Sequence, residues 1–203
     1  MPMPGLISAA ILCGGRGHRM GGLDKSTLMI DGQSILTRQL SALRPLTPHL
    51  MLIDRTSDRP APPGVTVYAD RIPDAGPLGG IMTALEGAPT DRVLVLACDL
   101  PFVTTEFLSA LAGCHDDADV IAPRDPAGRY ALCAVFHRRT TDTLRTLVSR
   151  GHLSVHAALE QLSVAEVPPA VRAACDTDGR LLMNVNTPQD YARAAHAATG
   201  VGA

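Results

Sequence analysis

The sequence predicts a single-domain α/β fold: a doubly wound, mostly parallel sheet with helices on both faces. Three observations support this fold class. The chain has 203 residues, the length of one ordinary domain, and 46% of them are hydrophobic, which is enough to bury a core. Short apolar runs alternate along the chain with longer segments of helical spacing. Several of these runs are apolar at consecutive positions, as expected for parallel strands that are buried on both faces.

The apolar runs predict six strands. In chain order they cover residues 6–12, 49–54, 65–69, 92–97, 119–123 and 130–136. The intervening segments predict helices near residues 34–44, 78–87, 104–113, 138–149, 154–162 and 187–198. The proline-rich stretch 58–65 predicts a surface loop before a strand, and no domain boundary is expected there. Residues 1–203 are therefore expected to form one domain.

Charge and cysteine usage argue against several classes of protein. The net charge of −2 lacks the basic excess of a nucleic-acid binder. The five cysteines are an odd number without CxxC spacing, so reduced thiols in the cytoplasm are expected rather than a disulfide framework or a zinc knuckle. No apolar run approaches the length of a membrane span, and the start of the chain does not have the pattern of a signal peptide.

The segment after the first predicted strand, CGGRGHRMGGLDKS (residues 13–26), has the composition of a phosphate-binding loop. Its glycines allow backbone N–H groups to approach a phosphate closely, and Arg19 and Lys25 can each neutralise phosphate oxygens. The segment does not match either of two standard phosphate-loop patterns. Met20 stands at the third glycine of GxGxxG, and Leu23 stands at the lysine of GxxxxGK[ST]. The segment therefore predicts a phosphate loop of another kind rather than an ordinary surface turn.

Two aspartates directly follow predicted strands, where ligands of such sheets bind. Asp99 comes after strand 92–97, well before the helix that starts near residue 104. It is the predicted Mg²⁺ ligand, since Mg²⁺ takes one or two carboxylates together with phosphate oxygens. Asp70 is predicted to bind a nucleotide or to support the metal; the alternative is a loop aspartate paired with Arg71.

Two further segments are expected at the same edge of the sheet. The segment DAGPLGG (74–80) can bring its backbone against a base or a ribose, and it can also be a tight turn that needs positive φ.

The other segment, NVNTPQD (184–190), contains a helix cap, with Thr187 at the N-cap and Asp190 three residues later. The cap leaves Asn184 and Asn186 unexplained. They share one face of an extended segment.

Four motifs together resemble one known family. LCGGRGHRMGGLDKSTL resembles the opening signature of the nucleotidyltransferases that act on the molybdenum cofactor, and its Gly-Gly-Leu-Asp-Lys ending resembles their guanylyltransferase, or MobA-type, branch. DAGPLGG, CDLPF (98–102) and NVNTPQD match the family in order and spacing, so that the resemblance covers about residues 6–195. In two places the sequence departs from the family pattern: Cys13 replaces the usual Ala, and GRYALCAVF (128–136) lacks a proline before LCA.

The resemblance implies a Rossmann-like nucleotidyltransferase fold, Mg²⁺ as cofactor, and transfer of GMP from GTP to molybdopterin with release of pyrophosphate. It also implies roles for individual residues. Arg19, Lys25 and Asp99 would be catalytic, and Asp99 would hold the metal. The nucleotide would be bound by Leu12, Cys13, Gly14, Gly15, Lys25, Asp70, Gly76, Gly79 and Asp99. The family resemblance of the segment NVNTPQD implies that Asn184 and Asn186 face an acceptor substrate or the metal–phosphate region. Expected partners are GTP, molybdopterin and, transiently, other proteins of molybdenum cofactor biosynthesis, with no nucleic acid and no membrane.

Three alternatives stay open. The first is a cytidylyltransferase of the same cofactor or a sugar-phosphate nucleotidyltransferase, which nucleotide competition would reveal. The second is a GTP-binding sensor without turnover, which would release no pyrophosphate. The third is a P-loop NTPase, which would release phosphate and which the failed lysine spacing disfavours.

Overall fold

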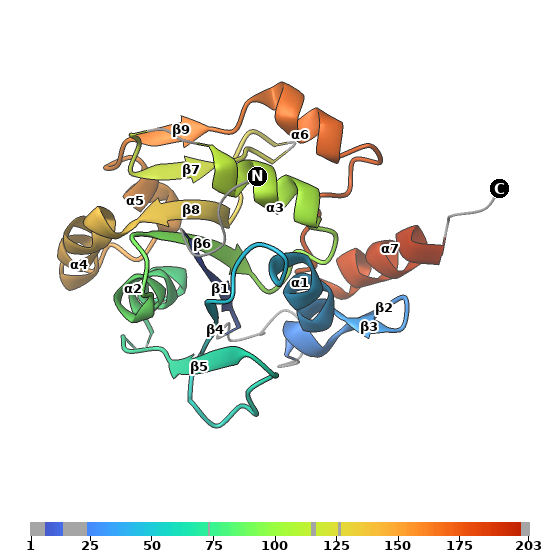
Figure 1. The fold of residues 1–203 in the computed structure, drawn as a ribbon, viewed down its shortest axis with the longest axis horizontal. Coiled ribbons are helices and arrows are strands. Elements are labelled where there is room, and N and C mark those ends of the chain that lie inside the picture. Colours follow the sequence, from blue (N-terminus) through green and yellow to red (C-terminus); the bar gives the residue numbers. More distant parts are fainter. Residues whose placement is uncertain (1–6, 14–23, 73, 115–116, 126, 200–203) are drawn as a thin grey trace.

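The structure is a computed structural model that describes residues 7–13, 24–72, 74–114, 117–125 and 127–199. Its centre is a seven-stranded sheet with the strand order β5-β4-β1-β6-β8-β7-β9 (Figure 1). The strands of this sheet are β1 (Ser8–Leu12), β4 (Leu50–Asp54), β5 (Val65–Ala69), β6 (Arg92–Ala97), β7 (Val120–Ala122), β8 (Cys133–His137) and β9 (Val164–Glu166).

The sheet is mostly parallel, as predicted. β5, β4, β1 and β6 run parallel to one another, and β7 and β9 form a second parallel pair. β8 is the exception, because it pairs antiparallel with both β6 and β7. The four parallel strands on one side of β8 therefore present their carboxyl ends along a common edge.

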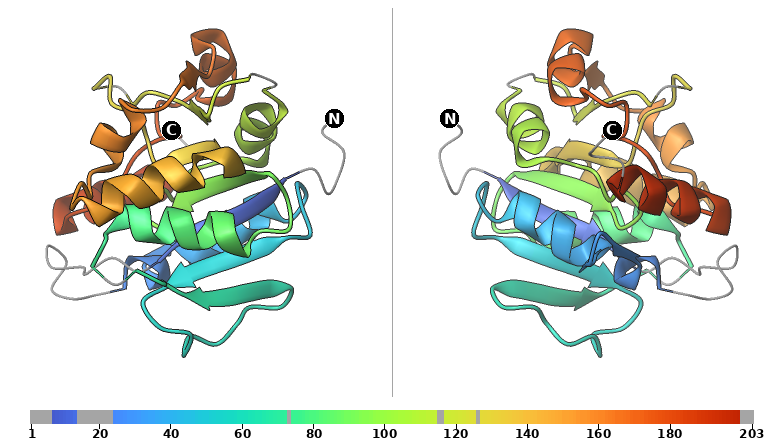
Figure 2. Two further views of the ribbon diagram at one scale, coloured as in Figure 1. Left: turned by 90° about the vertical axis from the view of Figure 1, so that its left-hand side faces the viewer. Right: turned by 90° about the vertical axis from the view of Figure 1, so that its right-hand side faces the viewer.

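Helices cover both faces of the sheet, which confirms the predicted layers (Figure 2). The helices are α1 (Ile35–Leu43), α2 (Pro77–Gly87), α3 (Thr105–Gly113), α4 (Thr141–Ser149), α5 (Val155–Leu159), α6 (Pro169–Cys175) and α7 (Pro188–Thr199). α2 and α4 lie over the face turned to the viewer on the left of Figure 2, and α1 lies over the opposite face, seen on the right. No helix in the described part of the chain combines the length and the apolar character needed to cross a membrane.

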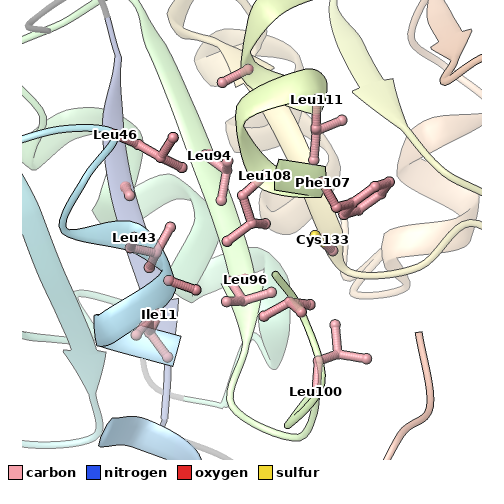
Figure 3. Packing of buried hydrophobic residues seen from close by; sticks show 14 of the residues in the cluster. Ile11, Leu43, Leu46, Leu94, Leu96, Leu100, Phe107, Leu108, Leu111 and Cys133 are labelled. Carbon is pink, nitrogen blue, oxygen red and sulfur yellow. The ribbon is translucent and has the colours of Figure 1, made fainter. Parts of the chain in front are cut away.

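Alternate residues of each central strand enter different hydrophobic clusters. Ile11 and Leu94 point into the cluster under α1 and α3, which Figure 3 shows. Ala10 and Val95 point into the cluster under α2, α4 and α5. Side chains alternate across a strand, so residues that are apolar in succession are buried on both faces, as their pattern predicted.

Some elements differ from the sequence prediction. The helix expected at 154–162 ends at Leu159, and the helix expected at 138–149 is divided into a 3-10 turn, η3 (Arg138–Thr140), and α4. α6 was not predicted because none of its residues is buried, which leaves it without an apolar period. β9 has only three residues and none of them is buried, so its pattern is equally weak.

A short hairpin was also missed. It consists of β2 (Met29–Ile30) and β3 (Gln33–Ser34), with Asp31 and Gly32 in the turn at φ of 50° and 71°. Asp-Gly is a typical sequence of such turns, so the signal was present although the strands are too short to show alternation.

α7 packs against this hairpin near the edge of the sheet. Ile30 and Ile35 form a small buried cluster with Val185 and Ala194. Tyr191 Oη also donates to Met29 O at 2.8 Å. In Figure 1 α7 accordingly lies beside the hairpin and α1. The segment before α7 is thereby brought beside Lys25, which precedes the hairpin in the chain.

Candidate active site

The predicted site segments meet at the carboxyl edge of the parallel strands. Cys98 N donates to Leu12 O at 3.2 Å, which ties the end of β6 to the end of β1. Cys13 N donates to Ile53 O at 2.8 Å, and Asp70 N donates to Asp54 O at 2.6 Å. The carboxyl ends of β5, β4, β1 and β6 therefore follow one another along one edge of the sheet, as the sheet topology predicted.

Lys25 is the centre of the described site. It begins a 3-10 turn, η2 (Lys25–Thr27), and its Nζ donates to Asn186 Oδ1 at 2.6 Å. The same Nζ lies 3.8 Å from Asp99 Oδ2. Val185 N donates to Asp99 O at 2.9 Å, so that the backbone before α7 is fixed to the end of β6. Three residues predicted from separate motifs are thus in contact.

The Asp99 carboxylate is only partly compensated. Its side chain is 17% exposed, and burial raises its pKa above the ordinary value. The Lys25 ammonium acts in the opposite direction but does not cancel the effect of burial. A buried carboxylate of this kind has an electrostatic reason to accept a further cation.

The Asp99 carboxylate has the chemistry of a Mg²⁺ ligand. Within the described ranges, no group of three or more His, Cys, Asp or Glu side chains could hold a metal ion. Mg²⁺ is typically bound through one or two carboxylates, with substrate phosphates and water completing its shell. Asp99 fits that requirement.

Asp70 has a local structural task. Its Oδ1 accepts from Ile72 N at 3.0 Å and from Thr83 Oγ1 at 3.4 Å, the latter on α2. The alternative pairing with Arg71 does not form, because that guanidinium binds Glu86 Oε2 at 3.1 Å. Burial raises the pKa of Asp70, against the effect of its hydrogen bonds. Its part in binding a nucleotide stays a prediction.

The two glycines predicted in the next segment have structural reasons of their own. Gly76 has a φ of 59°, which the tight-turn interpretation required. A Cβ on Gly79 would lie 2.8 Å from Ile72 O and 2.9 Å from Asp70 Oδ1, so only glycine lets α2 approach this loop. Contact of either glycine with a nucleotide remains a prediction.

The segment before α7 contains the predicted cap. Asp190 N donates to Thr187 Oγ1 at 3.1 Å, and Thr187 N donates to Asp190 Oδ2 at 2.9 Å. Asn186 is half-buried and holds Lys25, whereas Asn184 is exposed. Only one of the two predicted amides therefore has a partner in the Lys25 cluster.

The remaining predicted residues lie at the end of β1 and in the segment after it. Leu12 and Cys13 are described: Leu12 packs against Gly80, and Cys13 is buried. Gly14, Gly15 and Arg19 lie outside the described residues, and their roles stay predictions.

Sequence reasoning missed one side chain that contacts the turn bearing Lys25. Arg59, in the predicted surface loop 58–65, binds Asp24 and Ser26. No periodicity or motif marks it, because the contact joins residues more than thirty positions apart.

Comparison with known proteins gives a consistent picture. Residues 9–165 match the family described as "MobA-like NTP transferase domain". A probable molybdenum cofactor guanylyltransferase of Methanothermobacter thermautotrophicus is 33% identical over 93% of this chain and 98% of its own length. A molybdenum cofactor guanylyltransferase of Vibrio cholerae is 28% identical over 94% of this chain and 92% of its own.

A solved structure agrees with these matches. The crystal structure of molybdopterin-guanine dinucleotide biosynthesis protein A from Archaeoglobus fulgidus superposes with a TM-score of 0.77 at 26% identity. The superposition covers 95% of this chain and 98% of that protein. The likeness therefore extends over nearly the whole chain.

Proposed function

Because this chain belongs to the family of MobA-like NTP transferase domains, and is therefore a nucleotidyltransferase, we propose that it transfers GMP from GTP to molybdopterin. The products are molybdopterin guanine dinucleotide and pyrophosphate. The observation that carries this proposal is the meeting of Lys25, Asp99 and Asn186 at the carboxyl edge of the sheet. Similarity to relatives named as molybdenum cofactor guanylyltransferases supports the choice of nucleotide and acceptor.

Lys25 is proposed to hold the triphosphate. It is the only lysine of the chain, in which the other 17 of the 18 basic residues are arginines. An ammonium is a compact point charge that suits a crowded phosphate site, whereas arginine presents a broad planar fork. Asn186 holds the ammonium from one side without adding charge. Arg19, Gly14 and Gly15 of the preceding loop would complete the phosphate contacts.

Asp99 is proposed to hold Mg²⁺. The metal, when bound, would neutralise charge that builds up on the phosphates as pyrophosphate leaves. Asp99 is suited to this task because it lies at the end of a buried strand and keeps a charge that Lys25 only partly compensates. With GTP present, Lys25 would turn toward the phosphates and Asp99 toward the cation.

Nucleotidyl transfer by this site requires positioning more than proton transfer. The attacking group is the terminal phosphate of molybdopterin, which is already an anion, so no strong general base is needed. The contribution of the chain is to align the two phosphates and to offset their repulsion. Asn184 and Asn186 would face the acceptor. Transient contact with other proteins of molybdenum cofactor biosynthesis would supply the acceptor and receive the product.

The test is pyrophosphate release in the presence of Mg²⁺ and molybdopterin, compared for GTP, CTP, ATP and UTP. Release with GTP alone is the expected result, and removal of Mg²⁺ by a chelator should abolish it. Release with CTP alone would move the enzyme to the cytidylyl branch. Release with none of them would contradict the proposed transfer and favour a nucleotide sensor.

A further inference from the structure

The loop between β4 and β5 sends one side chain into the site region. Arg59 is only 18% exposed, although the loop around it lies at the surface. Its Nε donates to Asp54 Oδ2 at 2.5 Å and its Nη2 to Asp24 Oδ2 at 2.5 Å. Its Nη1 donates to Ser26 Oγ at 3.2 Å. Each of the three guanidinium nitrogens therefore has an acceptor.

Two of these acceptors flank Lys25 in the chain. Asp24 is the N-cap of η2, and its Oδ1 accepts from Ser26 N at 2.9 Å and from Ser26 Oγ at 2.7 Å. Ser26 is fully buried, so its hydroxyl depends on partners within the protein. Arg59 donates to both Asp24 and Ser26, so the three side chains form a closed ring of hydrogen bonds. Its third contact, with Asp54, anchors the ring to the end of β4.

Two described cations at this edge of the sheet, Arg59 and Lys25, bind different carboxylates. Burial would raise the pKa of Asp24, but hydrogen bonds from Ser26 and Arg59 outweigh it and the pKa is lowered. Burial likewise opposes the charge on Arg59, and the hydrogen bonds to Asp54 and Asp24 raise its pKa nonetheless. Arg59 thus compensates Asp24 and Asp54, whereas the Lys25 ammonium is left for Asp99 and Asn186.

We propose that Arg59 is a positioning residue, which neutralises Asp24 and Asp54 and so keeps the Lys25 ammonium between Asp99 and Asn186. Without the guanidinium, Asp24 would keep its hydrogen bonds from Ser26 but would lose its ion pair with Arg59. Because Asp24 is adjacent in sequence to Lys25, its carboxylate would then compete for the lysine ammonium. The proposal rests on the proposed function only for the task of Lys25, since the hydrogen bonds of Arg59 within the described residues go to Asp54, Ser26 and Asp24.

The test compares Arg59→Met with a matched control, Arg44→Met. Arg44 Nη2 donates to Pro63 O at 2.9 Å, so the control loosens the same loop without touching Asp24. GTP affinity is measured without molybdopterin, together with the melting temperature of each variant. Arg59→Met should weaken GTP binding on the order of 10- to 100-fold, and Arg44→Met should leave it near wild type. Equal weakening by both variants would overturn the proposal.

Two further variants separate positioning from general stability. In a Lys25→Ala background, Arg59→Met should cause no further loss of GTP affinity, because Arg59 acts through Lys25. Adding Asp24→Asn to Arg59→Met should restore much of the affinity, because asparagine keeps the cap but no longer attracts the ammonium. Additive losses of GTP affinity, or no recovery of affinity with Asp24→Asn, would contradict the proposal that Arg59 neutralises Asp24 on behalf of Lys25.

A spectroscopic readout is independent of nucleotide binding. Reductive methylation with isotopically labelled formaldehyde labels the one lysine side chain of this protein in addition to the N-terminus. The Lys25 methyl resonance should shift in Arg59→Met and stay in place in Arg44→Met. If the wild type binds GTP but releases no pyrophosphate, the proposed function fails while this inference stands. If the resonance is the same in both variants, the inference fails whatever the activity.

Discussion

At the residue scale, Lys25 differs from most of the described arginines in the partners that it binds. Most described arginines are committed to carboxylates or carbonyls of the fold, such as Arg138 with Ala88 O and Thr90 O. Lys25 is different, because it bridges an amide and a buried carboxylate that both belong to the site. Such contacts can be exchanged for phosphate and metal without unfolding the surrounding turn.

The first prediction concerns the identity of the lysine. Lys25→Arg keeps the positive charge, yet a guanidinium is larger and cannot occupy the position of Nζ between Asp99 and Asn186. We expect GTP affinity and turnover to fall together, nearly as far as in Lys25→Ala. Steady-state kinetics and GTP titration check this, with Arg129→Lys as a distant control at an exposed ion pair. Full activity of Lys25→Arg would show that charge alone is sufficient.

The second prediction separates binding from chemistry. Asp99→Ala should abolish pyrophosphate release and leave part of the GTP affinity, because Lys25 still meets the phosphates. Single-turnover measurements with saturating GTP distinguish the two effects. Wild-type turnover in Asp99→Ala would refute the metal assignment.

The third prediction uses the raised pKa of Asp99. A carboxyl whose folded pKa exceeds its unfolded value contributes stability below the unfolded pKa, and this contribution is lost as pH rises through the folded pKa. Asp99→Asn removes the titration, so its stability relative to wild type should grow as pH rises above about 4. Each unit of pKa shift corresponds to about 1.4 kcal/mol. Urea unfolding of both proteins across this range measures the difference; a difference that is flat or that shrinks with pH would contradict the account.

At the scale of elements, the approach of α2 to the loop before it illustrates packing that only glycine permits. An added Cβ on Gly79 would meet the Ile72 carbonyl and the Asp70 carboxylate, whereas an added Cβ on Gly113, at the end of α3, would meet no atom within 4 Å beyond its chain neighbours and its own helix backbone. The two positions therefore form a natural pair, since both are helical and differ in their surroundings.

The fourth prediction follows from this pair. Gly79→Ala should destabilise the fold by about 1–3 kcal/mol, because α2 must move away from Ile72 and Asp70. Gly113→Ala should be neutral or stabilising by up to about 1 kcal/mol, since alanine favours helix. Denaturant unfolding of both variants decides the matter. Equal changes in the free energy of unfolding at the two sites would mean that the close approach at Gly79 does not affect stability.

The same scale shows what sequence patterns can and cannot predict. Strands such as 92–97 and helices such as 104–113 were predictable because consecutive or periodic apolar residues reflect burial directly. α6 and β9 bury no residue, so they leave no such pattern. In the site, Asp99 was predictable as a residue at a strand end, and Lys25 as part of a motif. Arg59 was not, because its contacts depend on tertiary structure alone.

At the scale of the whole molecule, the site brings together residues that are far apart in the sequence. The Lys25–Asn186 contact joins residues 161 positions apart. It exists because α7 docks on the β2–β3 hairpin and α1 through a small buried cluster that includes Ala194. Docking of one terminal helix is therefore coupled to the geometry of the proposed phosphate site.

The fifth prediction tests this coupling. Ala194 is fully buried, so Ala194→Glu places a charge in the cluster and should undock α7, whereas Ala192→Glu on the exposed side of the same helix should not. We expect Ala194→Glu to lose GTP affinity and turnover while circular dichroism still reports the central sheet. Retained activity in Ala194→Glu would show that Asn186 reaches Lys25 without the helix.

The measurement that tests the central claim most directly is the fate of the α-phosphate of GTP. GTP carrying radioactive phosphorus at the α-position, incubated with the protein, Mg²⁺ and molybdopterin, should give a labelled dinucleotide. The same experiment with label at the γ-position should place all label in pyrophosphate. Asp99→Asn should give neither product. Label released as free phosphate from the γ-position, with no labelled dinucleotide, would identify a hydrolase and contradict nucleotidyl transfer by this site.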